Sequence, residues 1–140
     1  MFTERVRHVM EREKMLTAAP QTTVSEAARL MAYTNVSAVV VVEQGALAGL
    51  FTERDAVFRV IAQGLDPRTT RLSDVMTTSP VTVGPDRSFG YALQLMHHGR
   101  FRHVPVVEDG KPVGIVTARD ALDPDMEEFV AEASRREGIR

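Results

Sequence analysis

The sequence predicts an α+β fold built from two tandem copies of one β-α-β-β-α unit. The first observation is an internal duplication: at a shift of 65 residues, 17–55 falls on 82–120 without a gap, and 14 of the 39 aligned positions are identical. The second is that each copy repeats one order of patterns, in which an amphipathic helical stretch precedes two short apolar runs. The third is size, because 140 residues suffice for one shared core but not for two independent domains.

The elements of the first copy follow from its local patterns. A short strand is expected near Thr17, and 23–26 form a Thr-x-x-Glu capping box that opens an amphipathic helix. The β-branched run 38–42 and the run 47–51 then form a hairpin of buried strands. We expect a second helix to begin at Thr52.

The second copy repeats this order. Its first strand is expected at 81–83, its hairpin joins 104–107 to 113–116, and its second helix begins at Thr117. Upstream of the gapless block, Val9-Met10 falls on Val75-Met76 at a shift of 66. We therefore divide the chain into a first unit with an N-terminal helix (1–63), a linker (64–70), a second unit (71–122) and a C-terminal helix and tail (123–140).

Both ends of the chain are predicted to be helical. Asp123 is expected as an N-cap with Pro124 at the first helical position, and Arg135 and Arg136 suit the end of that helix. An apolar stripe of this helix needs a surface to lie on. The stripe consists of Met126, Phe129, Val130 and Ala133. A smaller stripe at the N-terminus consists of Val6, Val9 and Met10. Two interpretations stay open: the helices cover the core of their own chain, or they form a dimer contact.

Composition excludes several classes of function. Seventeen basic and nineteen acidic side chains give a net charge of −2, which makes nucleic acid an unexpected main partner. No run approaches a membrane span, no secretion signal opens the chain, and there is no cysteine, so we expect a cytoplasmic protein. No nucleophile with a base and no glycine-rich phosphate loop is found, and His97 and His98 diverge on a helix, so neither catalysis nor a metal site is expected.

The motif Thr-x-x-Asp stands where the last strand of each copy runs into a helix, at 52–55 and at 117–120. In one interpretation the threonine is a helix cap and the aspartate favours the positive end of the helix dipole. In the other, the exposed helix start and the carboxylate hold a polar ligand such as a ribose. The two are compatible, and the recurrence of Gly49, Thr52, Arg54 and Asp55 in the second copy favours a ligand site.

The paired pattern resembles the CBS domain family. The most specific stretch is 100–120, from Arg100 to Asp120, which is similar to the second half of a typical unit, and Val75-Met76 followed by Thr82-Val83 is also typical of the start of a unit. The resemblance implies two units packed sheet to sheet with pseudo-two-fold symmetry and two clefts between them. It also implies that the clefts bind an adenine nucleotide.

By this resemblance, Asp55 and Asp120 would hold ribose hydroxyls, and Thr52 and Thr117 would contact the ribose or a phosphate. Apolar residues of the first strands would sandwich the adenine, Thr17 and Ala18 at one base and Val81 and Val83 at the other. The full set of expected ligand-binding residues is Thr17, Ala18, Thr52, Arg54, Asp55, Val81, Val83, Arg102, His103, Thr117, Arg119 and Asp120.

The resemblance further implies that cationic residues of one unit face the aspartate of the other. We therefore place Arg102, His103 and Arg119 with Asp55, and Arg54 with the cleft of Asp120. Since charge-assisted bonds to phosphate are about twice as strong as neutral ones, the Asp55 cleft should prefer a phosphorylated ligand. His103 is expected to titrate near neutrality and to make phosphate binding depend on pH.

The function expected from this resemblance is a nucleotide-sensing regulatory module that is not an enzyme. AMP is the expected ligand, with ADP, ATP, NAD or S-adenosylmethionine as further possibilities, and no cofactor is required. The module would signal through the geometry of a homodimer or through a protein effector. The alternative is a ligand-free structural module that docks a partner through its terminal helices.

Overall fold

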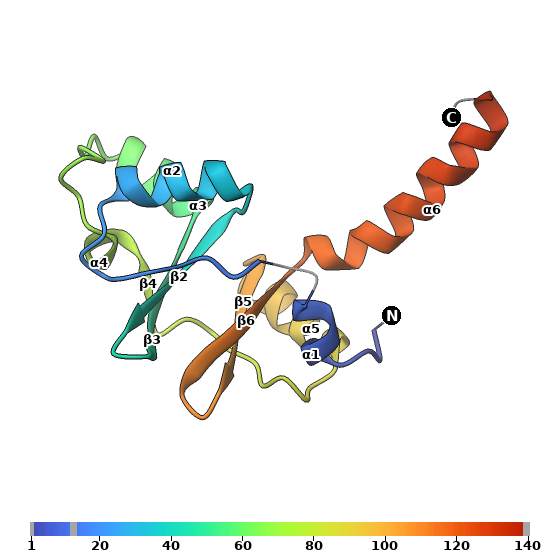
Figure 1. Ribbon diagram of the computed structural model, residues 1–140, viewed down its shortest axis with the longest axis horizontal. Helices are drawn as coiled ribbons and strands as arrows, with labels where there is room; N and C mark the ends of the chain where they lie inside the picture. The colour runs from blue at the N-terminus through green and yellow to red at the C-terminus, as the bar shows by residue number, and fades with distance from the viewer. Residues whose placement is uncertain (1, 12–13, 139–140) are drawn as a thin grey trace.

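The computed structural model describes residues 2–11 and 14–138, with the backbone alone at 123–128. It is a mixed α+β structure, which confirms the predicted fold class (Figure 1). A four-stranded sheet has the order β1-β2-β3-β4, and a two-stranded sheet pairs β5 with β6. The strands are β1 (Thr17–Ala18), β2 (Ala38–Glu43), β3 (Ala46–Thr52), β4 (Thr77–Thr78), β5 (His103–Glu108) and β6 (Lys111–Thr117). The helices are α1 (Val6–Met10), α2 (Val24–Thr34), α3 (Glu53–Asp55), the π-helix η1 (Ala56–Ile61), α4 (Leu72–Val75), α5 (Phe89–Gly99) and α6 (Arg119–Glu137).

The two hairpins have the same register. Val41 lies opposite Gly49 in the first copy and Val106 opposite Gly114 in the second, and both ladders shift register at the next residue of the first strand. The capping box predicted for α2 is present, with the Glu26 N–H donating to Thr23 Oγ1. These matches confirm that the repeat in the sequence is a repeat in the structure.

The first strand of the second copy is shorter than predicted. β1 pairs in parallel with β2, and the Val40 N–H donates to the Leu16 carbonyl. Pro105 occupies the position of Val40 in the second copy and has no N–H to donate. The expected strand at 81–83 is therefore reduced to one parallel bridge between Val83 and Val106.

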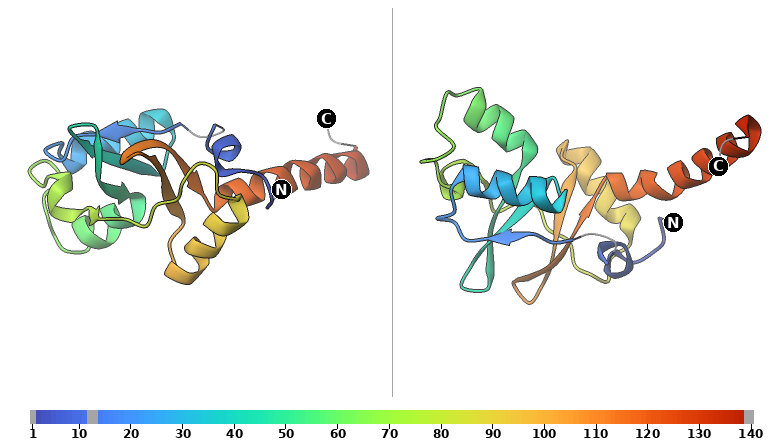
Figure 2. Two further views of the ribbon diagram at one scale, coloured as in Figure 1. Left: turned by 90° about the horizontal axis from the view of Figure 1, so that it is seen from below. Right: turned by 45° about the horizontal axis from the view of Figure 1, so that its top comes forward.

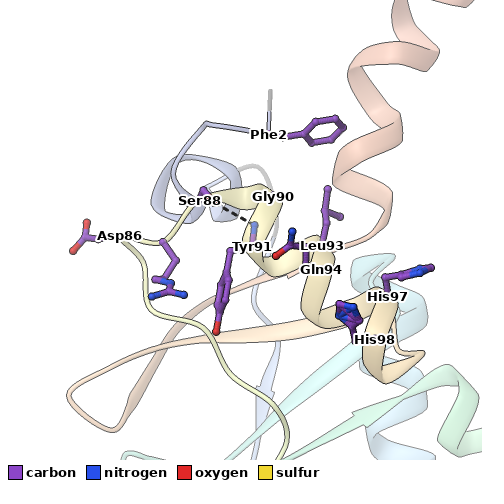
Figure 3. Close-up of a pocket in the computed structure, with 10 residues that line it drawn as sticks. Phe2, Asp86, Ser88, Gly90, Tyr91, Leu93, Gln94, His97 and His98 are labelled. Atoms are coloured by element: carbon purple, nitrogen blue, oxygen red, sulfur yellow. Dashed lines mark hydrogen bonds between the residues drawn. The ribbon is translucent and has the colours of Figure 1, made fainter.

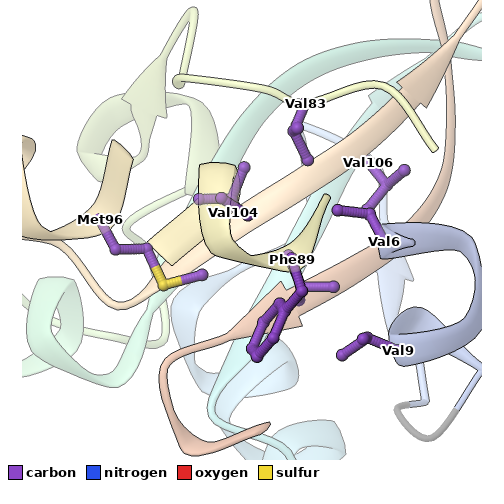
Figure 4. Close-up of a cluster of buried hydrophobic side chains, with 9 residues drawn as sticks. Val6, Val9, Val83, Phe89, Met96, Val104 and Val106 are labelled. Carbon is purple, nitrogen blue, oxygen red and sulfur yellow. The ribbon is translucent and has the colours of Figure 1, made fainter. Parts of the chain in front are cut away.

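The leading helices of the two copies are exchanged. α1 precedes the first unit in the sequence, but Val6 and Val9 are fully buried in the core of the second unit, together with Phe89 of α5 (Figure 4). α4 precedes the second unit, but Leu72 and Val75 belong to the core of the first. The interpretation that the N-terminal helix covers the core of its own chain is thus confirmed.

Two glycines make room for this exchange. A Cβ on Gly49 would lie 2.5 Å from Met76 Sδ and 2.8 Å from the Thr77 carbonyl oxygen. A Cβ on Gly114 would lie 2.7 Å from Met10 Sδ. The glycine that recurs beside each Thr-x-x-Asp motif therefore makes room for a methionine at the end of an exchanged helix, Met10 of α1 or Met76 directly after α4.

A third apolar cluster joins the two sheets. Val40 of β2 and Leu50 of β3 meet Ile115 of β6, and Ala38 completes the buried set. Because these side chains come from facing strands of both units, the units pack sheet to sheet as the fold class predicts.

The C-terminal helix differs from the prediction. α6 runs without a break from Arg119 to Glu137, and Ala118 is its N-cap. The expected start of a separate helix at Asp123 is wrong, because the helix that follows β6 continues through Pro124. The expected start of the second helix at Thr117 is also wrong, because Thr117 is the last residue of β6 and Ala118 is the N-cap. Figures 1 and 2 show α6 leaving the body of the molecule, and Phe129 and Val130 are exposed. The side chain of Met126, from the same predicted stripe, lies outside the described residues.

Within the described residues, the longest helix is too polar to cross a bilayer.

Candidate functional site

The end of β3 places Thr52 and Asp55 in a reciprocal capping box. The Thr52 N–H donates to Asp55 Oδ2 at 2.9 Å, and the Asp55 N–H donates to Thr52 Oγ1 at 3.3 Å. The first turn of α3 fixes this geometry, because both residues satisfy backbone donors that a helix start leaves unpaired. The capping interpretation of the motif is therefore confirmed for the first copy.

The second oxygen of the same carboxylate faces a cation. Asp55 Oδ1 lies 3.5 Å from Arg59 Nε, one turn further along the chain, and the Asp55 side chain is 10% exposed. A carboxylate oxygen has more than one acceptor position, so Oδ1 keeps capacity for another donor.

A cavity of about 630 Å³ opens beside this carboxylate, between the two units. It brings together six of the expected site residues, from both copies of the repeat. These are Thr52, Arg54, Asp55, Val81, Arg102 and His103. The other residues that line the cavity are Leu50, Glu53, Arg59, Thr77, Ser79, Pro80, Arg100 and Phe101. Cationic side chains of the second unit thus share one cavity with the aspartate of the first, as the resemblance implies.

His103 is the first residue of β5 and lies near the aspartates of both Thr-x-x-Asp motifs. Its Nε2 is 2.7 Å from Ser37 Oγ, and its strand partner is Thr117. Burial lowers the pKa of His103 below its ordinary value of 6.5, and Arg102 adds to this lowering, whereas Glu53, Asp55 and Asp120 oppose it. Burial therefore favours the neutral ring, which weighs against a cationic role for His103, and the expected pH dependence of phosphate binding stays a prediction.

Two expected positions of arginine need correction. Arg54 lines the cavity of Asp55 rather than serving Asp120, and its guanidinium lies 4.2 Å from the centre of the Phe58 ring. Arg119, expected with Asp55, begins α6 and does not line this cavity.

The expected adenine contacts are also only partly placed. Val81 lines the cavity, but Val83 is 4% exposed and belongs to the core of the second unit. Its parallel bridge to Val106 fixes it there, so Val83 does not line the Asp55 cavity beside Val81 as the expected adenine contact. In the first copy, Ala18 packs against the core of its own unit, while Thr17 is exposed.

The motif of the second copy is more deeply enclosed. The Thr117 N–H donates to Asp120 Oδ2 at 2.8 Å, and Asp120 is 3% exposed. Thr117 Oγ1 is buried and has no hydrogen-bond partner in the described structure. An unpaired buried hydroxyl costs about 1–3 kcal/mol, so Thr117 Oγ1 is an unusual feature of the second motif.

Sequence reasoning missed several residues that line the cavity, among them Arg59, Arg100 and Ser79. Arg59 stands four residues after Asp55, the spacing at which side chains on a helix interact, and this spacing could have identified it. Arg100 is the left-handed C-cap of α5, and Arg102 directly precedes β5, so the turn between the helix and the strand brings both to the cavity. Ser79 has φ 49°, in the left-handed region, and no signal in the sequence indicated this turn.

A second hollow of about 870 Å³ lies beside the start of α5 (Figure 3). Phe2, Ser88, Tyr91 and His98 are among the residues around it, and none of the expected site residues lines it. It is a wide surface depression without converging charges, so the smaller cavity at Asp55 is the better candidate site. Among the described residues, no three histidine or acidic side chains gather as a metal site requires.

Comparison with known proteins extends these observations to the whole chain. The family described as "CBS domain" matches the sequence twice, over residues 6–62 and 72–126. The CBS domain-containing protein YhcV of Bacillus subtilis is 43% identical over 107 residues, which are 76% of each protein.

Two solved structures share the fold. A conserved protein from Pyrococcus horikoshii superposes with a TM-score of 0.81 at 32% identity, covering 89% of this chain and 94% of its own. A candidate signal-transduction protein with CBS domains from Burkholderia ambifaria MC40-6 superposes with a TM-score of 0.81 at 28% identity, covering 89% and 95%.

Proposed function

Because this chain belongs to the CBS domain family and carries two CBS domains in tandem, we propose that it is a regulatory module that binds an adenine nucleotide in the Asp55 cavity. CBS domain pairs are regulatory modules, and they commonly bind adenine nucleotides.

One observation carries the proposal: acceptor and cationic groups from different units meet in a single cavity. Asp55 and Thr52 come from the first unit, while Arg102 comes from the second. A carboxylate suits the two hydroxyls of a ribose, and a guanidinium suits a phosphate. A nucleotide with its sugar on Asp55 and its phosphate toward Arg102 would therefore bridge the two units.

AMP is the ligand we propose first, with ADP, ATP, NAD and S-adenosylmethionine as competitors to be tested. Arg100 and Arg102 make no ion pair within the described residues, so both are free to meet a phosphate. Arg59 is engaged with Asp55, and Glu53 offsets part of the remaining positive charge. We further propose that the protein acts without a required cofactor and catalyses no reaction.

The motif of the second copy supports a second, weaker site. The unpaired Thr117 Oγ1 could exchange a hydrogen bond with a ligand hydroxyl beside Asp120. At the positions of Arg100 and Arg102, the first copy has Asn35 and Ser37. A ligand there would gain less from a phosphate, and the Asp55 cavity would therefore fill first with AMP.

The output we propose is a change in the arrangement of units or of two copies of the chain. A ligand shifts such an equilibrium only by its difference in affinity between the two states. The apolar side of α1 is buried in the core of the second unit, whereas α6 exposes Leu122, Phe129 and Val130. α6 is therefore the surface we assign to a homodimer contact or a protein effector. The same exposed face favours the alternative of a ligand-free docking module, provided that docking uses α6 alone.

The test is ligand binding by the full chain and by a double variant, Asp55→Ala with Asp120→Ala. In the wild type, AMP at a hundredfold excess over its Kd should stabilise the fold by about 2.7 kcal/mol, a rise in Tm of several degrees. The double variant should lose this rise, because the acceptors for ribose are gone. Asp86→Ala is the matched control, since Asp86 is an exposed carboxylate outside the cavity.

Two results would contradict the proposal. A folded double variant with the wild-type response to AMP would show that the carboxylates are not the site. The absence of a shift with AMP, ADP, ATP, NAD and S-adenosylmethionine in the wild type would favour the docking module.

A further inference from the structure

Arg59 holds the free side of the Asp55 carboxylate. Its Nε lies 3.5 Å from Asp55 Oδ1, while Oδ2 already accepts the Thr52 N–H at 2.9 Å. The carboxylate is thus held from both sides and cannot rotate without losing one of these contacts. An ion pair with a half-exposed arginine adds little to stability, so the value of this contact lies in the orientation that it imposes.

The other end of the same guanidinium is bound to the second copy of the repeat. Arg59 Nη1 donates to the carbonyls of Val75 and Met76, at 3.2 Å each. These residues end α4 and lead into β4, which pairs with β3 at Gly49 and Leu50. The chain then continues to Ser79, Pro80 and Val81, which form a wall of the cavity. One side chain therefore connects the Asp55 carboxylate with a wall of the cavity that comes from the second copy in sequence but is paired with the first sheet.

The helix that carries Arg59 has an unusual geometry that suits this task. In η1 the Ala62 N–H donates to the Val57 carbonyl at 2.8 Å, five residues back instead of four. Such π-helical turns are rare and are frequent at functional sites. The other arginine of this segment, Arg54, lies against the Phe58 ring and lines the same cavity, with no ion pair to Asp55 in the described structure.

The second copy offers no equivalent of this arrangement. At the shift of 65, the position of Arg59 is taken by Pro124, which has no side-chain donor. α6 also leaves the body of the molecule where η1 stays on the first unit (Figure 1). The role of Arg59 is therefore specific to the Asp55 cavity, since the second copy has no equivalent residue.

We propose that Arg59 is the positioning residue of the Asp55 cavity: it orients Asp55 toward the sugar and fixes the wall formed by 77–81 before a nucleotide enters. This inference rests on the proposed function, since it assigns the ribose to Asp55. A preformed site binds more tightly because less freedom is lost on binding. The diol of a ribonucleotide should profit most, since both of its hydroxyls need the carboxylate in one orientation.

The first test compares AMP with 2′-deoxy-AMP by calorimetry, on the wild type, Arg59→Ala, Arg59→Lys and the control Arg68→Ala. Arg59→Ala should weaken AMP about tenfold and reduce the preference for AMP over 2′-deoxy-AMP. Arg59→Lys should keep part of the preference, because an ammonium can still meet Asp55. Arg68→Ala should leave the preference unchanged, because Arg68 is an exposed arginine that pairs with Asp66 outside the cavity. A folded Arg59→Ala variant with the wild-type preference would overturn the proposal.

The second test needs no ligand. Amide hydrogen exchange at Thr77 and Thr78 should become faster in Arg59→Ala, because β4 loses its anchor, and should stay as in the wild type in Arg68→Ala. Unchanged exchange in Arg59→Ala would also overturn the proposal. If the wild type bound no adenine nucleotide, the proposed function would fail, and the exchange experiment would still decide whether Arg59 fixes the wall.

Discussion

The two copies of the repeat carry the same motif in different surroundings. In the first, Asp55 borders an open cavity, is paired with Arg59, and faces arginines of the other unit. In the second, Asp120 is almost fully buried and the hydroxyl of Thr117 has no partner in the described structure. Identical residues at identical positions therefore do not make equivalent sites, since the neighbours supplied by the other copy decide what each motif can bind.

The copies also differ in the helical segment that comes after the motif. η1 stays on its own unit, and Val60 is 1% exposed in the first core. The matching residue of the second copy is Asp125, and α6 carries its chain away from the body (Figure 2). A charged residue cannot replace a core valine without a partner, so this helix has no place on the second sheet. In the second copy, the helix after the motif therefore projects from the molecule and does not cover its own unit.

The largest effect that would break this comparison concerns the two glycines. Gly49→Ala should lower the free energy of unfolding by about 2–3 kcal/mol, because its Cβ would meet the rigid Thr77 carbonyl as well as Met76. Gly114→Ala should cost about 1 kcal/mol, because its Cβ meets only the side chain of Met10. Urea unfolding of both variants measures the difference. Equal losses would show that the two exchanged helices are held equally rigidly.

A smaller effect sharpens the contrast between the two ligand sites. Arg102→Ala should weaken AMP about tenfold and leave adenosine unchanged, because only the phosphate needs the guanidinium. Arg87→Ala is the control, since Arg87 lies over Tyr91, outside the cavity. Calorimetry with both ligands decides the point. An equal loss of affinity for AMP and adenosine would show that Arg102 does not bind the phosphate.

The smallest expected effect concerns pH. Because burial lowers the folded-state pKa of His103, the unfolded chain takes up a proton first as pH falls below 6.5. The free energy of unfolding should therefore decrease as pH falls through the unfolded-state pKa of about 6.5, until the folded state also titrates. This part of the decrease should be absent in His103→Gln.

The control for this effect is His97→Gln, because His97 lies on the exposed face of α5. Thermal unfolding across the pH range, followed for the three proteins, measures the difference. The prediction would be wrong if His103→Gln and the wild type lost stability in parallel. In that case one of the carboxylates around the histidine, and not the histidine, would set the pH dependence.

Much of the fold could be predicted because local signals and the repeat agreed. The capping box at Thr23, the hairpins and the helix start at Thr52 all depend on residues close in sequence. The exchange of α1 and α4 could not be predicted, since Val6 and Leu72 show only that both helices are apolar on one side. The start predicted at Asp123 failed because a helix already in progress absorbs a capping signal.

The candidate site was predicted in part for the same reason. Asp55, Arg102 and His103 share the cavity as expected, because the resemblance to CBS domain pairs implies that cationic residues of one unit face the aspartate of the other. Val83 and Arg54 were misplaced, since the side on which a residue lies depends on strand register and helix turn. The charge state of His103 depended on its burial, which composition does not reveal.

The exchange of α1 and α4 within one chain is the intramolecular counterpart of a domain swap. The first half of the sequence ends without the helix that closes its own sheet, and the second half begins with it. Separate halves would each expose an apolar face, yet two such fragments together hold every contact of the intact protein. Because those contacts are the same between chains as within one, opening the joint would turn monomers into intertwined dimers without any new interface.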